Sequence, residues 1–544
     1  MDSLPKIQSA VQLVGPDKLI LNKSKEVHMP GPHQILCRVE VIGLCFSDLK
    51  LLKQFSSHVR KGQIVSGINL EILKEMPSYV PGEAPTVPGH ETVVIVEAVG
   101  PGVENFKPAE RYLVQTDYRW LHTAGANAAF GYNFEGALQE YVLMDERVIT
   151  SPEGDSMLIP VSENLSASAV ALVEPWACVE DAYASKERTS IKAGGQMLVV
   201  AEAKEISNFK SQISNLTTHY GKPAKVTWVS KRPGPELPDA GYDDVVYFGS
   251  DAKTVEALFA KLAAHGLLNI VLCGGKFGRS VTTSVGRVHY GGIRIVGTTG
   301  SDPAESMKYI PKTDEIRPGD KINIVGAAGP MGTMHVIRNI CQGVENVSVF
   351  AADVDDRRIS ALTEIALPLA KKNNVHYQPY NPTRESIAQS FDYTILMAPV
   401  PDLVAAAVGN AGEQGIINIF AGIPATVTAE IDLDTYIRKQ LYFVGTSGST
   451  LDDMKQVLAK VESGRLNTDV SVAAVCGMEG ATDGIRAVEN RSIAGKIMVY
   501  PACHGLRLTR LEELHKKMPV VAKQLSDGMW NKAAEDMLLE ICHK

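Results

Sequence analysis

The chain has 544 residues, 45% of them hydrophobic, and a formal net charge of −8 at pH 7. This length allows about three domains, and the acidic balance gives no general attraction to nucleic acid or to an anionic membrane. A signal-peptide pattern and an apolar run of roughly 18 residues are both lacking, so we expect a cytoplasmic protein with small-molecule ligands and no membrane contact.

The N-terminal part, residues 1–189, contains short apolar runs such as "QILCRVEVIGL" and "TVVIVEAVG" between Pro- and Gly-rich turns. This pattern predicts a small β-rich domain. Three of its stretches offer metal-binding side chains: Cys45, the pair His90 and Glu91, and Glu174. Together they suit a zinc ion with an open coordination position. Taken singly, each also fits a structural role, as a core thiol, a satisfied polar group or a carboxylate at a helix start.

Residues 190–305 and 315–450 form a tandem repeat. The copies end in "VGTTGSDPAESMKYI" and "VGTSGSTLDDMKQVL", so that Gly297 matches Gly445, and Asp243 likewise matches Asp392. In both copies apolar runs alternate with helical stretches, which is typical of βαβ units around a parallel sheet. We therefore predict two doubly wound units of the dinucleotide-binding type.

The second copy contains the glycines that a dinucleotide site needs. In "INIVGAAGPMG" an apolar strand ends at Gly326, and Gly329 and Gly332 follow just before a helical stretch, where backbone N–H groups can hold a pyrophosphate. Asp353 ends the next strand and favours NAD by accepting ribose hydroxyls, although it would also serve as a helix cap. Arg357 and Arg358 keep NADP open as the alternative. The full predicted cofactor set is Gly326, Gly329, Pro330, Met331, Gly332, Asp353, Arg358, Gly422 and Thr446.

The first copy lacks this loop. The three glycine positions fall on Ala201, Lys204 and Ser207, while Glu202 and Glu205 add negative charge where phosphates would lie. At the place of Asp353 the first copy has Arg232. We predict that this copy keeps the fold and has lost the pyrophosphate site.

The C-terminal residues 505–544 read as two amphipathic helices interrupted at Pro519, and we expect them to serve packing or a subunit contact. The eight cysteines of the chain are scattered without a C-x-x-C pair, so we expect most of them to be reduced thiols.

Several motifs carry a resemblance to a known family. "GLCFSDLK", "PGHETVVIVEAVG", "GALQEYV", "LVEPWAC", "RPGD" and "IAGKIMVY" follow one another as in the zinc-dependent medium-chain dehydrogenase/reductase family, and "LVEPWAC" resembles its sorbitol dehydrogenase branch. The resemblance implies an α/β protein with a GroES-like catalytic domain (1–189), a degenerate Rossmann-like repeat (190–305), an NAD(P)-binding Rossmann domain (315–450), a return segment to the catalytic domain (451–504) and a helical tail (505–544).

The resemblance also implies the site. Cys45, His90 and Glu174 would bind one catalytic zinc, and Glu91 would act as a ligand or through water. Ser47 would relay a proton beside the substrate oxygen, and Asp48 would steady a ligand. No structural zinc is expected, because "RYLVQTDYRWLHTAGANAAFGYNFEGALQEY" contains no cysteine. The implied activity is an NAD(P)-linked interconversion of alcohol and carbonyl on a polyol, sugar or sugar phosphate.

An insertion between Cys45 and His90 departs from the family pattern. Its cationic or ionisable residues are Lys53, His58, Arg60 and Lys61, and they fit either contact with a phosphate or carboxylate of the substrate or a solvated loop.

Two other functions remain open at this point. A zinc-free quinone or enone reductase would share the glycine loop, and a non-enzymatic binding or scaffold protein would account for the decayed copy. The final strands of the copies, "IRIVGT" and "LYFVGT", are expected at exposed sheet edges. We predict that these edges meet inside one chain as a pseudo-dimer, with homo-oligomers as the alternative.

Overall fold

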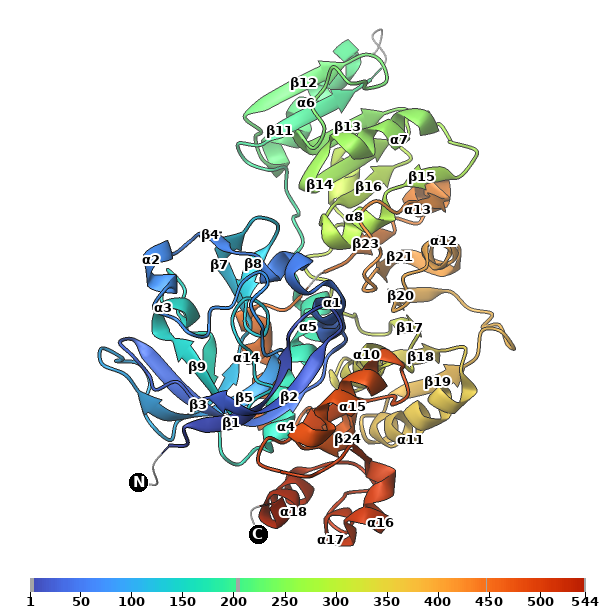
Figure 1. The fold of residues 1–544 in the computed structure, drawn as a ribbon. Coiled ribbons are helices and arrows are strands. Elements are labelled where there is room, and N and C mark those ends of the chain that lie inside the picture. The colour runs from blue at the N-terminus through green and yellow to red at the C-terminus, as the bar shows by residue number, and fades with distance from the viewer. Residues whose placement is uncertain (1–3, 202–205, 447, 543–544) are drawn as a thin grey trace. The chain divides into compact units, whose positions relative to one another are not determined.

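The computed structural model describes residues 4–201, 206–446 and 448–542 (Figure 1). It divides into two compact units, which are treated separately below. Unit 1 comprises Met1–Ala177 and Ser449–Lys544, and unit 2 comprises Cys178–Gly448.

Unit 1 is built around an eight-stranded sheet that joins both ends of the chain. Strand β25 pairs antiparallel with β3, so that Met498 lies opposite Gly43. The sheet order is β10(Leu158–Pro160), β6(Arg111–Val114), β5(Glu91–Val99), β3(Gln34–Gly43), β25(Lys496–Val499), β24(Val472–Cys476) and β26(Thr509–Arg510), with β9(Tyr141–Asp145) also paired to β3. Two smaller sheets comprise β1(Ile7–Leu13) with β2(Leu19–Glu26), and β4(Ile64–Ser66), β7(Asp117–Thr123) and β8(Asn127–Ala129).

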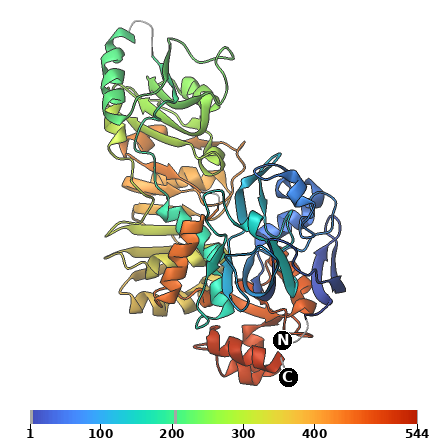
Figure 2. The same cartoon turned by 90° about the vertical axis from the view of Figure 1, so that its left-hand side faces the viewer.

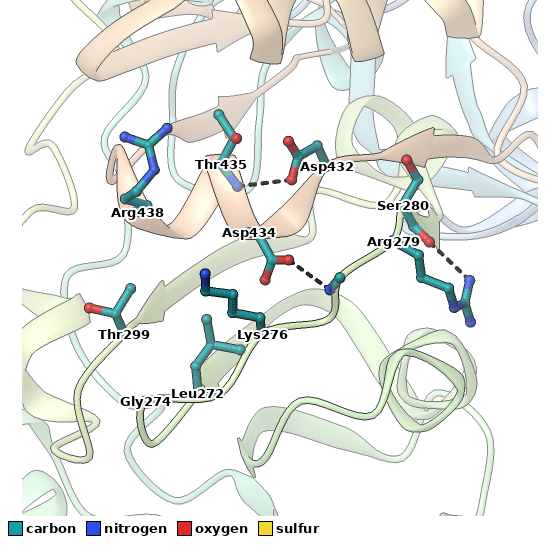
Figure 3. Close-up of a pocket in the computed structure, with 12 residues that line it drawn as sticks. Leu272, Gly274, Lys276, Arg279, Ser280, Thr299, Asp432, Asp434, Thr435 and Arg438 are labelled. Atoms are coloured by element: carbon teal, nitrogen blue, oxygen red, sulfur yellow. Dashed lines mark hydrogen bonds between the residues drawn. The ribbon is translucent and has the colours of Figure 1, made fainter.

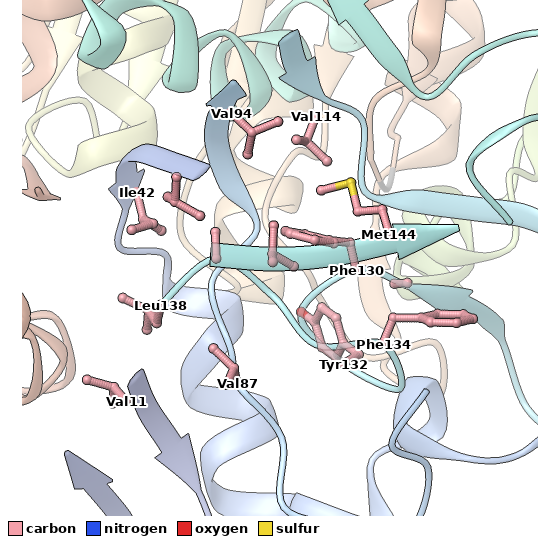
Figure 4. Packing of buried hydrophobic residues seen from close by; sticks show 14 of the residues in the cluster. Val11, Ile42, Val87, Val94, Val114, Phe130, Tyr132, Phe134, Leu138 and Met144 are labelled. Carbon is pink, nitrogen blue, oxygen red and sulfur yellow. The ribbon is translucent and has the colours of Figure 1, made fainter. Parts of the chain in front are cut away.

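The strands of unit 1 enclose a core of aliphatic and aromatic side chains, of which Val94, Phe130, Leu138 and Met144 are examples (Figure 4). The alternating apolar residues of β3 and β5 face this core, as the β-rich prediction requires. The helices of unit 1 that precede the tail are α1(Phe46–Gln54), α2(Leu70–Leu73), α3(Glu146–Ile149), α4(Ala167–Ala171), the start of α5(Val173–Ala184), α14(Leu451–Glu462) and α15(Met478–Glu489).

The second repeat lies in unit 2 and forms a parallel six-stranded sheet in the strand order of a complete dinucleotide-binding fold. The order is β19(His376–Tyr380), β18(Ser348–Ala352), β17(Lys321–Val325), β20(Phe391–Leu396), β21(Ala411–Asn418) and β23(Tyr442–Val444). Helices α10(Pro330–Cys341) and α11(Asp356–Lys372) contact the β17–β19 side, and α12(Pro401–Asn410) contacts β20 and β21.

The first repeat, also in unit 2, forms a parallel sheet with five strands. Their order is β12(Lys225–Val229), β11(Gln196–Val200), β13(Tyr242–Phe248), β14(Leu262–Val271) and β16(Arg294–Thr298). Among the described residues, a sixth strand corresponding to β19 is lacking. The accompanying helices are α6(Ile206–Tyr220), α7(Ala252–Lys261), α8(Val285–Tyr290) and α9(Ala304–Met307).

The two sheets meet edge to edge at β16 and β23, which are in contact (Figures 1 and 2). The Tyr436 hydroxyl bridges them, because it donates to the Ile295 carbonyl of β16 and accepts from the Phe443 N–H of β23. Tyr436 belongs to α13(Leu433–Arg438). Close by, β15(Val281–Thr283) pairs antiparallel with β22(Ala429–Ile431). One hydrophobic core contains residues of both repeats, which confirms the predicted internal pseudo-dimer.

The tail packs on unit 1. It contains α16(Leu514–Lys517), α17(Pro519–Ala522), which begins at the predicted break, and α18(Lys532–Cys542). The Glu535 carboxylate accepts hydrogen bonds from the backbone N–H groups of Ala167 and Ser168, and Trp530 is fully buried. These contacts confirm a packing role.

Two cysteines depart from the reduced state expected for most of them. Cys503 and Cys542 form a disulfide between the main body of unit 1 and the end of α18, with their Cα atoms 4.8 Å apart. No local sequence pattern indicates this disulfide, because 39 residues separate the two cysteines. Among the described residues, none of the helices combines the length and apolar character of a membrane span.

Candidate functional site

Three of the predicted metal ligands converge in unit 1. Cys45 is the N-cap of α1, while His90 and Glu91 lie at the start of β5. One ligand atom from each residue falls within 4.8 Å of the other two, so the three side chains can share a metal ion. Cysteine, histidine and carboxylate are the ligand types of catalytic zinc sites.

Ser47 and Asp48 lie where the resemblance implies. The Ser47 hydroxyl is 3.1 Å from Cys45 Sγ and 3.0 Å from His90 Nε2. On the other side of the ring, His90 Nδ1 is 3.0 Å from Asp48 Oδ1, which fixes the orientation of the imidazole. Burial opposes protonation of His90, but Asp48 and Cys45 outweigh it and raise the pKa of the imidazole well above its ordinary value.

Lys496 is part of this site, and sequence reasoning missed it. Its ammonium group forms a buried ion pair with Glu91 Oε1. Burial alone would lower the pKa of Lys496, but Glu91 and Cys45 raise it above its ordinary value. The other carboxylate oxygen, Glu91 Oε2, is buried without a hydrogen-bond partner. It lies so close to Gly43 that a Cβ there would collide with it. Since Lys496 is 405 residues from Glu91, no local motif could link them.

Glu174 does not belong to the group of three described above, although it is buried near it. Burial raises the pKa of Glu174 to about 7, while the charge of His90 opposes the shift and that of Glu91 adds to it. The carboxylate is therefore within electrostatic reach of the site, and its role as a zinc ligand stays a prediction.

The insertion distributes its basic residues between different environments. Lys53 is ion-paired with Asp17 and Glu489, while buried Lys61 donates to the carbonyls of Val80 and Ala84. Both ammonium groups are thus engaged by other residues of unit 1.

His58 and Arg60 instead lie around the Tyr132 ring. The ring centroids of His58 and Tyr132 are 5.1 Å apart, and Tyr132 is 6.0 Å from the His90 ring. The Arg60 guanidinium lies over Tyr132 at 5.7 Å and forms an ion pair with Asp117 at 2.5 Å. Burial lowers the pKa of His58 to about 4, so this ring is neutral at pH 7. One cation of the insertion, Arg60, thus lies against a ring that also lies near His90.

The glycine loop of the second repeat has the geometry expected for close approach of a ligand. Gly326 has φ of 84°, a conformation that favours glycine, and a Cβ at Gly332 would collide with the carbonyl oxygens of Gly326 and Ala327. Gly329 is the N-cap of α10, Pro330 is its first residue, and Met331 is partly exposed. The N-terminal end of α10 therefore faces this loop, where an anion is favoured.

Asp353 follows β18 and is oriented by the loop itself. Its carboxylate accepts from the backbone N–H groups of Ala328 at 3.0 Å and Asp355 at 3.2 Å. Asp353 is 9% exposed. Arg358, in the first turn of α11, is 3.8 Å from the Asp355 carboxylate and is about one-third exposed. Both predicted cofactor residues thus lie beyond the same strand end, with Asp353 the more enclosed.

Gly422 and Thr446 follow β21 and β23, and the first of them is covered by the first repeat. A Cβ at Gly422 would lie 2.6 Å from the hydroxyl of Tyr290, the last residue of α8. The Thr446 hydroxyl is buried and has no hydrogen-bond partner. Sequence reasoning missed Tyr290, since its proximity depends on how the repeats pack.

The corresponding loop of the first repeat is described in part. Lys204, Glu202 and Glu205 lie outside the described residues, as does the side chain of Ser207. Ala201 is buried after β11. Arg232 forms an ion pair with Asp251 at 3.2 Å, and both side chains are about half exposed. The loss of the pyrophosphate site stays a prediction from the sequence.

Comparison with known proteins agrees with this arrangement. Residues 31–153 match the alcohol dehydrogenase GroES-like domain. The chain is 25% identical to L-sorbose 1-phosphate reductase of Klebsiella pneumoniae, with 41% of this chain and 56% of the relative covered. It is 26% identical to mannitol-1-phosphate 5-dehydrogenase of Aliivibrio fischeri, with 41% and 57% covered. The chain thus spans little more than half the length of these curated relatives.

A solved structure shares the fold over most of the chain. The 2R,3R-butanediol dehydrogenase of Bacillus subtilis superposes with a TM-score of 0.53 at 15% identity, covering 91% of this chain and 99% of that one. The likeness shows a shared fold. Residues 31–153 thus match the GroES-like domain of alcohol dehydrogenases, and a Rossmann-type unit follows in the same chain. For the rest of the chain, the solved structure shows a likeness of fold.

Proposed function

We propose that this protein is a zinc-dependent oxidoreductase that interconverts an alcohol and a carbonyl compound with a nicotinamide cofactor. The observation that carries the proposal is the convergence of Cys45, His90 and Glu91 within 4.8 Å, with the Ser47 hydroxyl hydrogen-bonded to two of them. The glycine loop before α10 supports a cofactor with a pyrophosphate, and Asp353 favours NAD over NADP.

Two observations support a zinc ion at these residues: their ligand chemistry, and a buried carboxylate oxygen that has no hydrogen-bond partner. Cys45 and His90 would hold the ion with Glu91, whose Oε2 lacks a partner, or with Glu174. When bound, zinc supplies a Lewis acid that polarises the substrate oxygen. The Ser47 hydroxyl takes the proton from the substrate alcohol, and Asp48 keeps the His90 ring in place.

Metal analysis combined with activity assays tests this function. We expect purified protein to contain one equivalent of zinc and to oxidise or reduce polyols, sugars or their phosphates with NAD(H). Cys45→Ser should lose both zinc and activity while it still binds NADH. Cys273→Ser, at an exposed cysteine of the first repeat, is the matched control and should keep both.

The same assays separate the alternatives. Activity that survives complete removal of the metal would contradict the zinc mechanism and favour a quinone or enone reductase. Absence of nicotinamide binding in calorimetry would favour a binding or scaffold protein. The zinc content of Glu91→Gln and Glu174→Gln decides between the two carboxylates. Only the substitution that removes the true ligand should weaken zinc retention, by about 10-fold or more.

We further propose that the substrate carries a phosphate, which Arg60 binds. Arg60 lies over Tyr132, one ring away from His90, and its guanidinium can exchange part of its pairing with Asp117 for a phosphate oxygen. The named activities of the two curated relatives, both on phosphate esters, support this substrate class.

Arg60→Ala tests the phosphate contact. We expect kcat/KM for a phosphorylated polyol to fall about 10- to 100-fold, which corresponds to one charge-assisted contact, and that for the unphosphorylated polyol to stay the same. Lys53→Ala, which removes an ion-paired lysine of the same segment, should change neither. An equal fall for both substrates would contradict phosphate recognition by Arg60 without touching the proposed dehydrogenase activity.

A further inference from the structure

Unit 2 contains a second candidate binding site, which lies in the first repeat. It is a cavity of about 580 Å³ at the carboxyl ends of β14 and β16, near Leu272 and Thr299. Its opposite wall is α13 of the second repeat (Figure 3). Ligands of open parallel sheets bind beyond the carboxyl ends of the strands, and a cavity of this size is adequate for a small metabolite.

Two cations of this cavity are not neutralised by strong partners. Lys276 has no hydrogen bond or ion pair within the part of the chain that the structure describes. Arg438 reaches one carboxylate, Glu413, only at 3.8 Å, and its side chain is 58% exposed. Figure 3 shows Lys276, Thr299 and Arg438 around the same side of the cavity.

The charged groups that share the lining are already engaged. Both carboxylate oxygens of Asp434 accept backbone N–H groups, from Phe277 and Gly278. Asp432 accepts the N–H of Thr435. Arg279 is held by Glu256 at 2.9 Å and by a backbone carbonyl. Asp432 and Asp434 keep their negative charge, since N–H groups do not neutralise it, and Lys276 and Arg438 supply positive charge without a close counter-charge.

The internal repeat shows that both cations, Lys276 of the first copy and Arg438 of the second, have neutral counterparts. Arg438 stands at the same distance before the closing "VGT" as Tyr290, which covers Gly422 in the second copy. Lys276 stands in the same way opposite Pro424. The neutral Tyr290 thus lies beside Gly422, whereas its counterpart, the cation Arg438, lines this cavity. The charge of the lining therefore differs between this cavity and the equivalent place in the second repeat.

We propose that this cavity binds the oxyanion group of a small metabolite, a phosphate ester or a carboxylate. Lys276 Nζ and the Arg438 guanidinium neutralise the charge, and the Thr299 hydroxyl donates a hydrogen bond. The body of the ligand rests against Leu272 and the glycines that follow it. This site is separate from the metal-binding residues and does not depend on the proposed dehydrogenase activity.

Calorimetry on the full chain tests the site with glycerol 3-phosphate, malonate and, as the neutral probe, glycerol. We expect at least one of the two anions to bind to the wild type and glycerol not to bind. The double variant Lys276→Ala/Arg438→Ala should weaken that binding at least about 10-fold. Arg279→Ala, at the rim of the same cavity, should keep it. Preference for one anion assigns the ligand as a phosphate ester or a carboxylate.

Two outcomes would overturn the proposal. In the first, neither anion binds. In the second, the double variant binds the anions as the wild type does, so that they bind elsewhere, such as at the glycine loop of the second repeat. Thermal unfolding of each variant shows whether it is folded. If the double variant is not, the charge-conserving Lys276→Arg and the single variant Arg438→Gln replace it. Arg438→Gln should then weaken binding, and Lys276→Arg should retain it.

Discussion

The two repeats of unit 2 share a fold and differ in the residues beyond the ends of their strands. The second has six strands, a glycine loop with no space for side chains at Gly332, and Asp353 oriented by that loop. The first has five strands and Arg232 in place of Asp353. At the shared edge, by contrast, both β16 and β23 contribute fully buried apolar residues: Ile295, Val296, Phe443 and Val444.

The comparison shows that edge strands and loops of a duplicated sequence are under different constraints. Edge strands must stay apolar because each covers the other, and an uncovered edge is prone to aggregation. Loop residues beyond the strand ends contribute little to the core, so they can change without loss of the fold. The first repeat therefore covers the sheet edge of the second, and its loop residues can bind another ligand.

Glu187→Gln breaks the junction between the repeats and should have the largest effect. Glu187 binds Arg294 of β16 through two bonds of 2.7 Å and also accepts the hydroxyl of Tyr442 on β23. The variant leaves Arg294 buried without its counter-charge, so unit 2 should lose about 3–5 kcal/mol of unfolding free energy in urea titrations. Glu430→Gln, an exposed change in β22, is the control and should cost under about 0.5 kcal/mol.

The same pair predicts a pH dependence. Burial would raise the pKa of Glu187, but Arg294 and Tyr442 outweigh it and lower the pKa below its ordinary value. The stabilisation is thus present above about pH 4.5 and is lost as the pH falls through the lower folded value. The neighbouring Asp314 has a pKa raised well above its ordinary value, mainly by burial, and so acts in the opposite direction. The stability gap between wild type and Glu187→Gln should shrink below pH 4.5; a constant gap would refute the assignment.

Gly332→Ala sharpens the contrast in ligand binding. The new Cβ collides with two carbonyl oxygens of the glycine loop, so NADH should bind about 100-fold more weakly, or about 2.7 kcal/mol, in fluorescence titrations. Gly409→Ala, in α12 of the same repeat, meets nothing within 4 Å and should leave NADH affinity unchanged. Normal affinity in Gly332→Ala would mean that the cofactor does not use this loop.

Tyr436→Phe removes the bridge between the edges and should have the smallest effect of the three. The Ile295 carbonyl and the Phe443 N–H lose their partner in a buried place, which should cost about 2 kcal/mol of unfolding free energy. Chemical denaturation measures it. Tyr309→Phe, whose hydroxyl bonds to Gly297 of β16 alone, tests whether the loss depends on linking both strands and should cost less.

Much of the fold and part of the site could be predicted from the sequence. The repeat and its glycine loop are local patterns, because strand periodicity and the need for positive φ at Gly326 act within a few residues. Cys45, Ser47 and Asp48 likewise share one helix start. Lys53 and Lys61, by contrast, were candidates for substrate contact, and only the structure shows them engaged elsewhere.

The sequence by itself determined which residue types were available and which segments repeat. Tertiary structure decided which of them meet: Lys496 reaches Glu91, Tyr290 covers Gly422, and Cys503 joins Cys542. The physical reason is that local sterics and periodicity act over a turn of chain, whereas these contacts depend on the docking of elements far apart in sequence. The edge strands β16 and β23 illustrate both contributions. Their apolar residues can be recognised in the local sequence, whereas their contact with each other depends on tertiary packing.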